Sequence, residues 1–385
     1  MNREFLHPDF KIDFNSMAYK FRFAIVSDLH IALPHTIWQH PSRFHWVEVS
    51  IHALESVLEH LTQLELDFLL IPGDLTQHGE AENHSWLSER LSKLPFPVYV
   101  VPGNHDVPVL RADSQSISFR DFPYYYRKFG YNQPEQSYYI CELMPTVKLI
   151  GLNSNSFDYE GKLLGRLDQH QLEWLKGVLA NTGDDLVLVM VHHNVIEHLP
   201  NQSQHPMVQN YILQNASELL QVLARHGVKL IFTGHLHVQD VAQSHGIYEI
   251  TTGSLVSYPH PYRILEFHQD NYGREWLQFL SYRVESLPEF PNFQHSSREW
   301  MRDRSLPFLV RFLSLPPFNL SPLQAEELAP SFKDFWATVA CGDALLDYPE
   351  FSTHLRQCFQ RYGAISSSGI PTLIDNHSTL LLSNL

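Results

Sequence analysis

Runs of consecutive hydrophobic residues recur along the chain, and polar or turn-forming residues follow each run. Short apolar runs bounded in this way are typical of β-strands that are buried on both faces. Six such runs stand at residues 21–28, 66–74, 96–106, 147–154, 185–194 and 228–237. Each run is therefore predicted to contain a strand.

Between several of these runs, apolar residues repeat at steps of three and four, which is the spacing of one helix face. The pattern is present at residues 46–64, 167–181 and 216–227, and Gly227 ends the last segment. Strands that alternate with helices predict an α/β domain.

After Gly253 the pattern changes. Residues 262–270 and 274–286 have the short alternating runs of antiparallel strands. Prolines then become frequent, and helical spacing returns at residues 325–343 and 350–363.

These changes predict three regions: an amino-terminal segment (1–20), a main α/β domain (21–287) and a helical carboxyl-terminal extension (288–385). The extension carries aromatic residues without catalytic spacing, namely Trp300, Phe308, Phe312 and Phe335. Apolar helical segments must bury their faces, so the extension is expected to cap the domain or to join subunits in a homo-oligomer.

Composition limits the partners and the location. The 27 Lys and Arg residues against 42 Asp and Glu residues give a net charge of −15, which makes nucleic acid an unexpected partner. Cys141, Cys341 and Cys358 are scattered and show no metal-ligand spacing. With no stretch approaching ~20 apolar residues, the sequence predicts a cytoplasmic protein that does not engage a membrane.

Asp, Asn and His residues follow the strand-like runs, and open α/β folds bind ligands at that edge of the sheet. They are Asp28 and His30, Asp74, Asn104 with His105 and Asp106, His192 with His193, and His235 with His237. In a chain with 24 histidines, the last pair taken alone would be read as the end of a strand. The recurrence of such residues after five runs predicts a shared site instead.

The residue types suit divalent metals. Carboxylate oxygen and imidazole nitrogen bind Zn, Mn, Fe or Ni, and one aspartate can hold two ions by giving one oxygen to each. Asp74 is the natural bridge, and glycines at 73, 103 and 234 allow the backbone to come close to the ions. The sequence therefore predicts a site for two divalent metal ions.

Five blocks occur in a fixed order: Asp28-x-His30, Gly73-Asp74, Gly103-Asn104-His105-Asp106, His192, and Gly234-His235-Leu236-His237. In this order they resemble the calcineurin-like metallophosphoesterase family, over roughly residues 21–255. The resemblance implies a four-layer α/β/β/α sandwich with the metals at one edge, followed here by the helical extension.

The resemblance also implies the ligands. One metal would be bound by Asp28, His30, Asp74 and His237, and the other by Asp74, Asn104, His192 and His235. Neighbouring residues of a strand point to opposite sides, so only one of His192 and His193 is expected to bind. His193 is predicted to support His192 or to pack.

Two such ions would activate a hydroxide for attack on a phosphoester and leave the site with a charge of about +1, which attracts a phosphodiester anion. His105 is expected to act off the metals, as general acid for the leaving alkoxide or as electrostatic stabiliser of the transition state. Asp106 is predicted either to orient His105 or, with equal weight, to organise the turn.

Departures from other branches narrow the substrate. Gln77 stands where purple acid phosphatases have a tyrosine, and Gly-Asn-His-Asp differs from the Gly-Asn-His-Glu of protein phosphatases. The motifs look most like the group of class III cyclic-nucleotide phosphodiesterases and related glycerophosphodiesterases. We therefore expect hydrolysis of small phosphodiesters, with 3′,5′-cyclic AMP as first candidate. The alternatives are a phosphomonoesterase, a nuclease and a non-catalytic binding scaffold.

Other polar and aromatic residues are expected to be structural. His35, His40 and His45 follow the first motif and could line the entrance to the site, but loop histidines are mostly solvated or form simple hydrogen bonds, so a substrate role is not expected. The aromatic segment that begins at Phe122 is expected in the core or an interface rather than against a nucleobase. Arg127, inside it, is expected on a solvated face.

Overall fold

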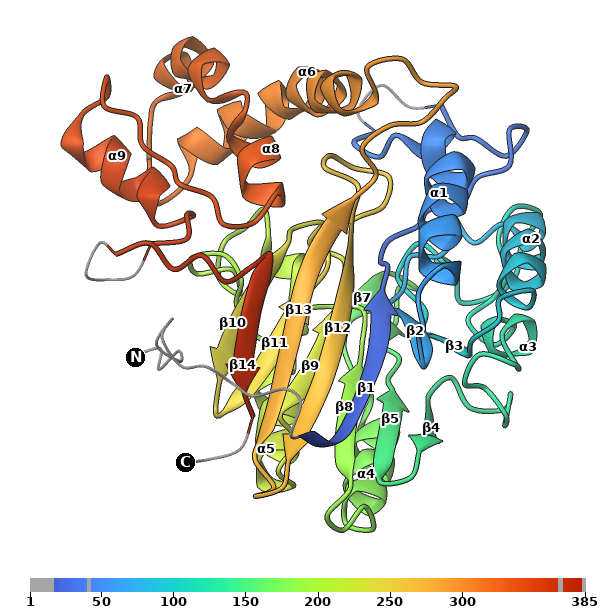
Figure 1. Cartoon of the computed structure of the whole chain (residues 1–385). Coiled ribbons are helices and arrows are strands. Elements are labelled where there is room, and N and C mark those ends of the chain that lie inside the picture. The colour runs from blue at the N-terminus through green and yellow to red at the C-terminus, as the bar shows by residue number, and fades with distance from the viewer. Residues whose placement is uncertain (1–16, 40–42, 366–369, 383–385) are drawn as a thin grey trace.

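Two six-stranded β-sheets stacked face to face form the centre of the protein (Figure 1). The computed structural model describes residues 17–39, 43–365 and 370–382. Most of the predicted amino-terminal segment, and His40, lie outside the described residues. Among the described helices, none is long and apolar enough to cross a membrane.

The first sheet has the strand order β14-β13-β12-β1-β2-β3. Its strands are β1 (Met17–Ile25), β2 (Phe68–Ile71), β3 (Val98–Val100), β12 (Pro261–Asp270), β13 (Glu275–Arg283) and β14 (His377–Leu381). β1, β2 and β3 run parallel, whereas β12 pairs antiparallel with β1 and with β13. The carboxyl ends of the three parallel strands therefore meet at one edge.

The second sheet has the order β10-β11-β9-β8-β5-β4. Its strands are β4 (Tyr139–Met144), β5 (Val147–Gly151), β8 (Leu186–Met190), β9 (Leu230–Thr233), β10 (Asp240–Ser244) and β11 (Ile247–Thr251). β5, β8, β9 and β11 are parallel. A separate hairpin pairs β6 (Asn155–Phe157) with β7 (Leu163–Gly165).

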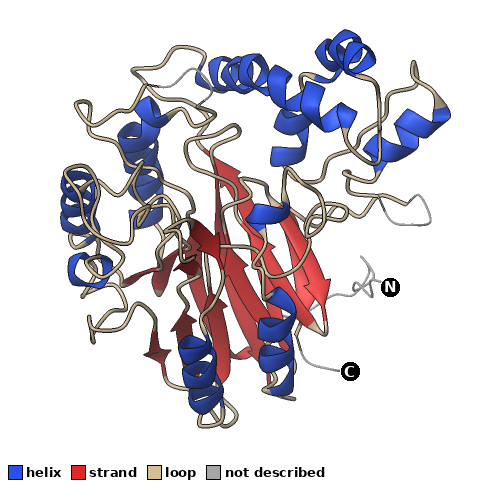
Figure 2. Ribbon diagram, turned by 180° about the vertical axis from the view of Figure 1, so that it is seen from behind, coloured by secondary structure: helices blue, strands red, loops and turns tan. Residues whose placement is uncertain are grey.

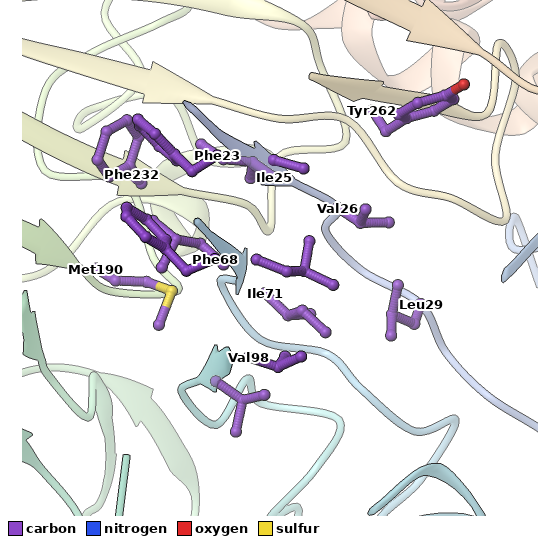
Figure 3. Close-up of a cluster of buried hydrophobic side chains, with 14 of the residues drawn as sticks. Phe23, Ile25, Val26, Leu29, Phe68, Ile71, Val98, Met190, Phe232 and Tyr262 are labelled. Carbon is purple, nitrogen blue, oxygen red and sulfur yellow. The ribbon is translucent and has the colours of Figure 1, made fainter. Parts of the chain in front are cut away.

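The hydrophobic core lies between the two sheets (Figure 3). Phe23 of β1 stacks on Phe68 of β2 at 4.8 Å between ring centroids and meets Phe232 of β9 edge to face at 5.6 Å. All three side chains are buried. These contacts explain why the runs are apolar on consecutive residues: each strand packs on the opposing sheet with one face and on helices with the other.

Helices cover the outer faces. α1 (Ser50–Thr62) and α2 (Ala81–Leu91) place Leu54 and Leu87 in the same core as β1–β3. α4 (Gln169–Leu179) and α5 (Ala216–Arg225) pack on the second sheet and stand in front of it in Figure 2. A single-turn helix, α3 (Phe122–Tyr125), follows β3. The α/β/β/α arrangement predicted from the sequence is confirmed.

The carboxyl-terminal helices gather at one end of the two sheets (Figure 1). They are α6 (Phe293–Ser314), α7 (Pro322–Leu328), α8 (Phe335–Ala340) and α9 (Thr353–Gln360). The chain then returns to the first sheet, where β14 pairs antiparallel with β13. A helical region is present as predicted, but it is not helical to its end, because β14 is a strand of the main sheet.

Several elements have no clear sequence pattern. α6 is 22 residues long and contains Pro307. Because prolines are frequent in this segment, the sequence does not predict a helix there. The turn between β10 and β11 has no long apolar run on either side, so that hairpin was not predicted. Most predicted strands and helices fall inside the expected segments, but β1 begins at Met17, before the run at 21–28. The helix expected at 325–343 is divided into the end of α7, a 3₁₀ turn (Ala329–Phe332) and α8.

Candidate active site

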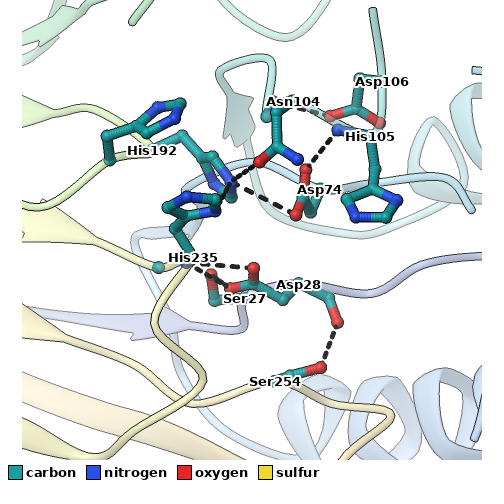
Figure 4. Close-up of polar contacts among 12 residues, drawn as sticks. Ser27, Asp28, Asp74, Asn104, His105, Asp106, His192, His235 and Ser254 are labelled. Atoms are coloured by element: carbon teal, nitrogen blue, oxygen red, sulfur yellow. Dashed lines mark hydrogen bonds and ion pairs between the residues drawn. The ribbon is translucent and has the colours of Figure 1, made fainter. Parts of the chain in front are cut away.

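Five loops that follow strand ends bring their polar side chains together at one edge of the sandwich (Figure 4). β1, β2 and β3 lead into the loops that carry Asp28, Asp74 and Asn104, and β8 and β9 lead into those that carry His192 and His235. Backbone bonds join neighbouring loops: the N–H of His30 donates to the carbonyl of Asp74 at 2.9 Å. Residues separated by up to 209 positions thus share one site.

Asp28, His30, Asp74 and His237 form the first ligand group. Their ligand atoms all lie within 4.8 Å of one another. Nε2 of His237 is 3.1 Å from Oδ1 of Asp28 and 3.4 Å from Nε2 of His30. Nε2 of His30 is 3.7 Å from Oδ2 of Asp74. This is the set that the family resemblance implies for one metal.

Asp74, Asn104, His192 and His235 form the second ligand group. Nε2 of His192 lies 3.1 Å from Oδ1 of Asn104, 3.1 Å from Nδ1 of His235 and 3.3 Å from Oδ2 of Asp74. The four side chains converge on a single point, as Figure 4 shows for the labelled residues.

The hydrogen-bond donors and acceptors of the second ligand group are arranged so that a cation could bind between them. Nδ1 of His192 lies 2.8 Å from the carbonyl oxygen of Pro72, so it carries the proton and donates. The His192 pKa of about 9 places a second proton on Nε2, which faces the oxygens of Asn104 and Asp74. A divalent cation at this position would take the place of that proton and interact with the same oxygens. The donor set of carboxylate, amide oxygen and imidazole suits Zn, Mn, Fe or Ni.

Asp74 belongs to both groups through the same oxygen. Oδ2 faces His30 and His192, whereas Oδ1 accepts a hydrogen bond from the backbone N–H of His105 at 2.8 Å. Oδ2 is thus the oxygen that faces both groups, and the expectation that Asp74 gives one oxygen to each ion stays a prediction.

Five of the candidate ligands have left-handed backbone conformations: φ is 51° at Asp28, 42° at His30, 49° at Asp74, 66° at His235 and 58° at His237. Residues other than glycine seldom adopt positive φ, and such strain clusters at functional sites. The surrounding loops hold these residues in strained conformations that point their side chains at the site.

Two glycines make room for carboxylates. A Cβ atom on Gly103 would overlap the Asp74 carboxylate, and one on Gly234 would overlap Ser27 and the Asp28 carboxylate. The sequence predicted close backbone approach at these positions. In the structure the backbone approaches the candidate ligands themselves.

The site attracts positive charge. Burial by itself lowers the pKa of His192, but the carboxylates of Asp74 and Asp28 outweigh it and raise this pKa to about 9. Burial and the neighbouring histidines lower the pKa of His30 and His235, which keeps both in the neutral form that binds metals. Burial alone would raise the pKa of Asp74, yet His192 and His105 hold it well below its usual range.

His105 stands beside the ligand groups without belonging to either. Its Nδ1 atom lies 2.7 Å from the carbonyl oxygen of Gln77, and its ring is 4.7 Å from that of His30. Because Nδ1 donates to Gln77, Nε2 is the nitrogen available to a substrate. His105 therefore lies outside the two groups of expected ligands, and its role off the metals stays a prediction.

Asp106 organises the turn. Oδ2 accepts the N–H groups of Gly103 and Leu75 at 2.8 and 3.1 Å, and Oδ1 accepts the N–H and hydroxyl of Thr76 at 2.8 and 3.0 Å. Burial and then the charge of Asp74 raise the pKa of Asp106 to about 7. Gln77, not Asp106, contacts the His105 ring, so the geometry corresponds to the turn-organising alternative and corrects the catalytic orienting role.

His193 supports the second group from outside. Its Nδ1 atom is 2.7 Å from the hydroxyl of Ser154, and its ring lies 4.3 Å from that of His235. His192 belongs to a candidate ligand group, whereas His193 belongs to none of those found among the described residues. The ring contact is with His235 as well as with His192, which is 5.3 Å away.

His45 was expected to be an ordinary loop histidine, and this expectation is wrong. Its ring stacks on that of His30 at 4.1 Å and lies 4.7 Å from that of His237. His30, His45 and His105 also offer nitrogens within 4.8 Å of one another. A single histidine in a loop carries no pattern that reports this proximity.

The remaining residues behave as expected. His35 is exposed and pairs with Glu82 at 2.6 Å. Phe122 and Tyr126 of the aromatic segment are buried in the core, and Arg127 is exposed with its guanidinium 5.0 Å from the Tyr124 ring.

One cavity of about 620 Å³ opens on the site. Its walls include Asp74, Asn104 and His235 on one side and Phe308 and Trp336 of the carboxyl-terminal helices on the other. The cavity thus joins the predicted metal site to the carboxyl-terminal extension.

The sandwich, with carboxylates and histidines clustered at one edge, defines a phosphoester hydrolase of the metal-dependent class. A sequence profile described as calcineurin-like phosphoesterase matches residues 21–239. The chain belongs to this family, and it is a hydrolase.

Curated relatives are 26–29% identical to the chain over the stretches that match. A protein of Haemophilus influenzae named 3′,5′-cyclic adenosine monophosphate phosphodiesterase CpdA is 26% identical, over 73% of this chain and 98% of its own length. One of Arcobacter nitrofigilis, named "Probable glycerophosphodiester phosphodiesterase GpdQ", is 29% identical, over 55% and 70%. A 3′,5′-cyclic-nucleotide phosphodiesterase of a Nostoc species is 27% identical, over 52% and 67%.

Among solved structures, a dimetal phosphatase from Danio rerio is 17% identical and covers 67% of this chain and 95% of its own, with a TM-score of 0.48.

Proposed function

We propose that the protein hydrolyses small phosphodiesters at a centre of two divalent metal ions, with 3′,5′-cyclic AMP as the first candidate substrate. The observation that carries the proposal is the position of Asp74 Oδ2, which faces His30 at 3.7 Å and His192 at 3.3 Å. One oxygen that is common to two groups of acceptors is the arrangement of a bridging carboxylate.

The metals would be held by the two ligand groups. Two divalent ions in such a site supply an activated water and stabilise charge on the attacking and leaving oxygens of an in-line displacement. The candidate ligands are two carboxylates, one amide and four histidines, so two divalent ions would leave the occupied site with a net positive charge that attracts an anionic phosphodiester.

His105 has the geometry to act on the leaving group. Its Nδ1 atom is bound to the carbonyl oxygen of Gln77, which leaves Nε2 free, and His105 lines the same cavity as Asp74. A protonated Nε2 would either transfer its proton to the departing alkoxide, a poor leaving group at neutral pH, or keep the proton and stabilise the negative charge of the transition state. Asp74 and His30 hold the loop of His105 through its backbone N–H and the ring contact.

The names of the relatives support diesters as the substrate class. One curated relative is named for cyclic AMP, another for cyclic nucleotides and a third for glycerophosphodiesters. The cavity also favours small substrates, because the carboxyl-terminal helices form one of its walls. A polynucleotide would in addition meet a chain with a net charge of −15.

The test is an activity panel on protein reconstituted separately with Mn²⁺, Zn²⁺, Fe²⁺ and Ni²⁺. The substrates are 3′,5′-cyclic AMP, glycerophosphocholine and 4-nitrophenyl phosphate, a monoester. We expect the two diesters to be hydrolysed with kcat/KM at least tenfold above that of the monoester. A higher value for the monoester with every metal contradicts the proposal.

Two further features remain predictions. A homo-oligomer through the carboxyl-terminal extension is testable by light scattering of the purified protein. A cytoplasmic location is consistent with three free cysteines in the structure and is testable by cell fractionation.

A further inference from the structure

The carboxyl-terminal helices contribute an aromatic surface to the cavity above the candidate metal site. Phe44, Phe308 and Trp336 all line this cavity, and we call them the aromatic wall. Phe308 meets Trp336 edge to face at 4.9 Å and 78°, and Phe44 meets Phe308 at 6.4 Å and 77°. Phe308 and Trp336 are only partly buried, because the cavity leaves part of each side chain uncovered.

The wall is fixed in orientation. Trp336 packs against Phe335 at 4.9 Å and Phe312 at 5.5 Å, and both of these are buried. The indole N–H of Trp300 donates to the carbonyl oxygen of Phe44 at 2.9 Å. Rings held by such packing give a binding surface that loses little conformational freedom when a ligand arrives.

Packing also fixes the distance between the aromatic wall and the candidate metal ligands. Leu236, between the candidate ligands His235 and His237, is buried in the same hydrophobic cluster as Phe312 and Phe335. Gln239 donates its backbone N–H to the carbonyl of Ala340 at the end of α8, at 3.1 Å. The loop that carries two candidate ligands therefore packs directly on the helices that carry Phe308 and Trp336.

The cavity walls carry few charges. Among the described residues that line it, only Arg43 and Asp74 have fully charged side chains besides the histidines. Arg43 is already paired with Glu48 at 2.5 Å. A charged or polyhydroxyl substituent placed against Leu199, Met207 and Met301 would give up water on an apolar part of the wall.

We propose that the aromatic wall determines specificity by binding a planar aromatic group of the substrate while its phosphate lies at the ligand groups. This inference rests on the proposed phosphodiesterase function. Perpendicular rings offer an aromatic guest one face and one edge at the same time, which are the two favourable contacts between aromatic groups. A flexible alkyl chain gains no such directional contact and loses rotamer freedom when it binds.

The test compares the wild type with Phe308→Leu and Trp336→Leu, which keep an apolar side chain but remove the ring. The substrates are two aromatic diesters, 3′,5′-cyclic AMP and bis(4-nitrophenyl) phosphate, and two others, glycerophosphocholine and dibutyl phosphate. We expect kcat/KM for the aromatic diesters to fall about tenfold, chiefly through KM, and the other values to change less than threefold. Leu323→Ala on the exposed face of α7 is the matched control, and thermal unfolding verifies that each variant folds.

An equal loss for all four diesters overturns the inference, and a larger loss for glycerophosphocholine or dibutyl phosphate assigns the wall to a cationic or alkyl group instead. Binding of adenosine 5′-monophosphate, measured by calorimetry, separates this inference from the proposed function. If the wild type hydrolyses no diester but Trp336→Leu weakens that binding about tenfold, the proposed role of the aromatic wall is supported and the proposed phosphodiesterase function is wrong. If diesters are hydrolysed and neither variant changes nucleotide binding or the preference for aromatic diesters, only the proposed role of the aromatic wall is wrong.

Discussion

Nδ1 of His105 lies 2.7 Å from the carbonyl oxygen of Gln77. This contact decides which nitrogen of His105 meets a substrate, and it involves a backbone atom whose position no side-chain pattern reports. Since His105 is absent from both ligand groups, its loss is expected to separate turnover from metal binding.

His105→Ala is expected to lower kcat about 10²–10³-fold for alkoxide leaving groups and less than tenfold for 4-nitrophenolate, which needs no proton. Bound metal, measured by elemental analysis, should stay unchanged. His295→Ala, at an exposed position of α6, is the control. An equal loss for both kinds of leaving group contradicts the role as acid.

Asn104→Ala and His237→Ala are expected to lower the bound metal from about two to about one ion per chain, because each removes a ligand from a different group. Equilibrium dialysis against Mn²⁺ or Zn²⁺ measures the stoichiometry. A chelator should abolish activity and lower the unfolding temperature, and the added ion should restore both. A wild-type stoichiometry of one ion would exclude the binuclear centre.

Gly234→Ala is expected to weaken metal binding about 10–100-fold, because the new methyl group displaces the Asp28 carboxylate. Gly177→Ala is the matched control, since a Cβ atom there meets nothing within 4 Å. Isothermal titration of the metal-free proteins gives the affinities. An unchanged metal affinity in the Gly234 variant would contradict this, because it would mean that the loop of Asp28 can shift to accept the methyl group without disturbing the site.

His198 gives a pH-dependent prediction away from the site. It is buried, with Nδ1 2.6 Å from Asp240 and Nε2 3.1 Å from Glu249. Burial lowers its pKa, but Glu249 and Asp240 outweigh burial and raise the pKa to about 10. A histidine whose pKa is raised by folding stabilises the folded protein. This stabilisation is fully present at pH values below the pKa of the unfolded state, about 6.5. That stabilisation is lost as the pH rises through the folded value.

His198→Gln is therefore expected to destabilise the protein by about 3 kcal/mol at pH 6.5, with the difference from wild type shrinking toward pH 10. Thermal unfolding at pH 6.5, 8 and 10 measures it, and His295→Gln serves as the exposed control. A difference that stays constant with pH would mean that His198 is neutral in the folded protein.

The candidate ligands could be predicted because they follow apolar strands in an order that the chain itself displays. Asp28, Asp74 and His192 each come after a run whose burial fixes the end of a strand, and parallel strands deliver their ends to one edge. The sequence predicts that Asp106 lies near the site, but it does not predict that its carboxylate accepts hydrogen bonds from the backbone N–H groups of Thr76 and Gly103. That choice depends on loop conformation, which the residue type leaves open.

The sequence by itself determined the alternation of strands and helices, the order of the five motifs and the residue types that can bind metal, because these depend on local periodicity and side-chain chemistry. Only the tertiary structure decided that His45 joins the site and that Trp336 lines its cavity. It also decided that β14 returns to the first sheet. These features come from packing between residues far apart in the chain, where each contact depends on shape and burial and leaves no repeat or spacing in the sequence.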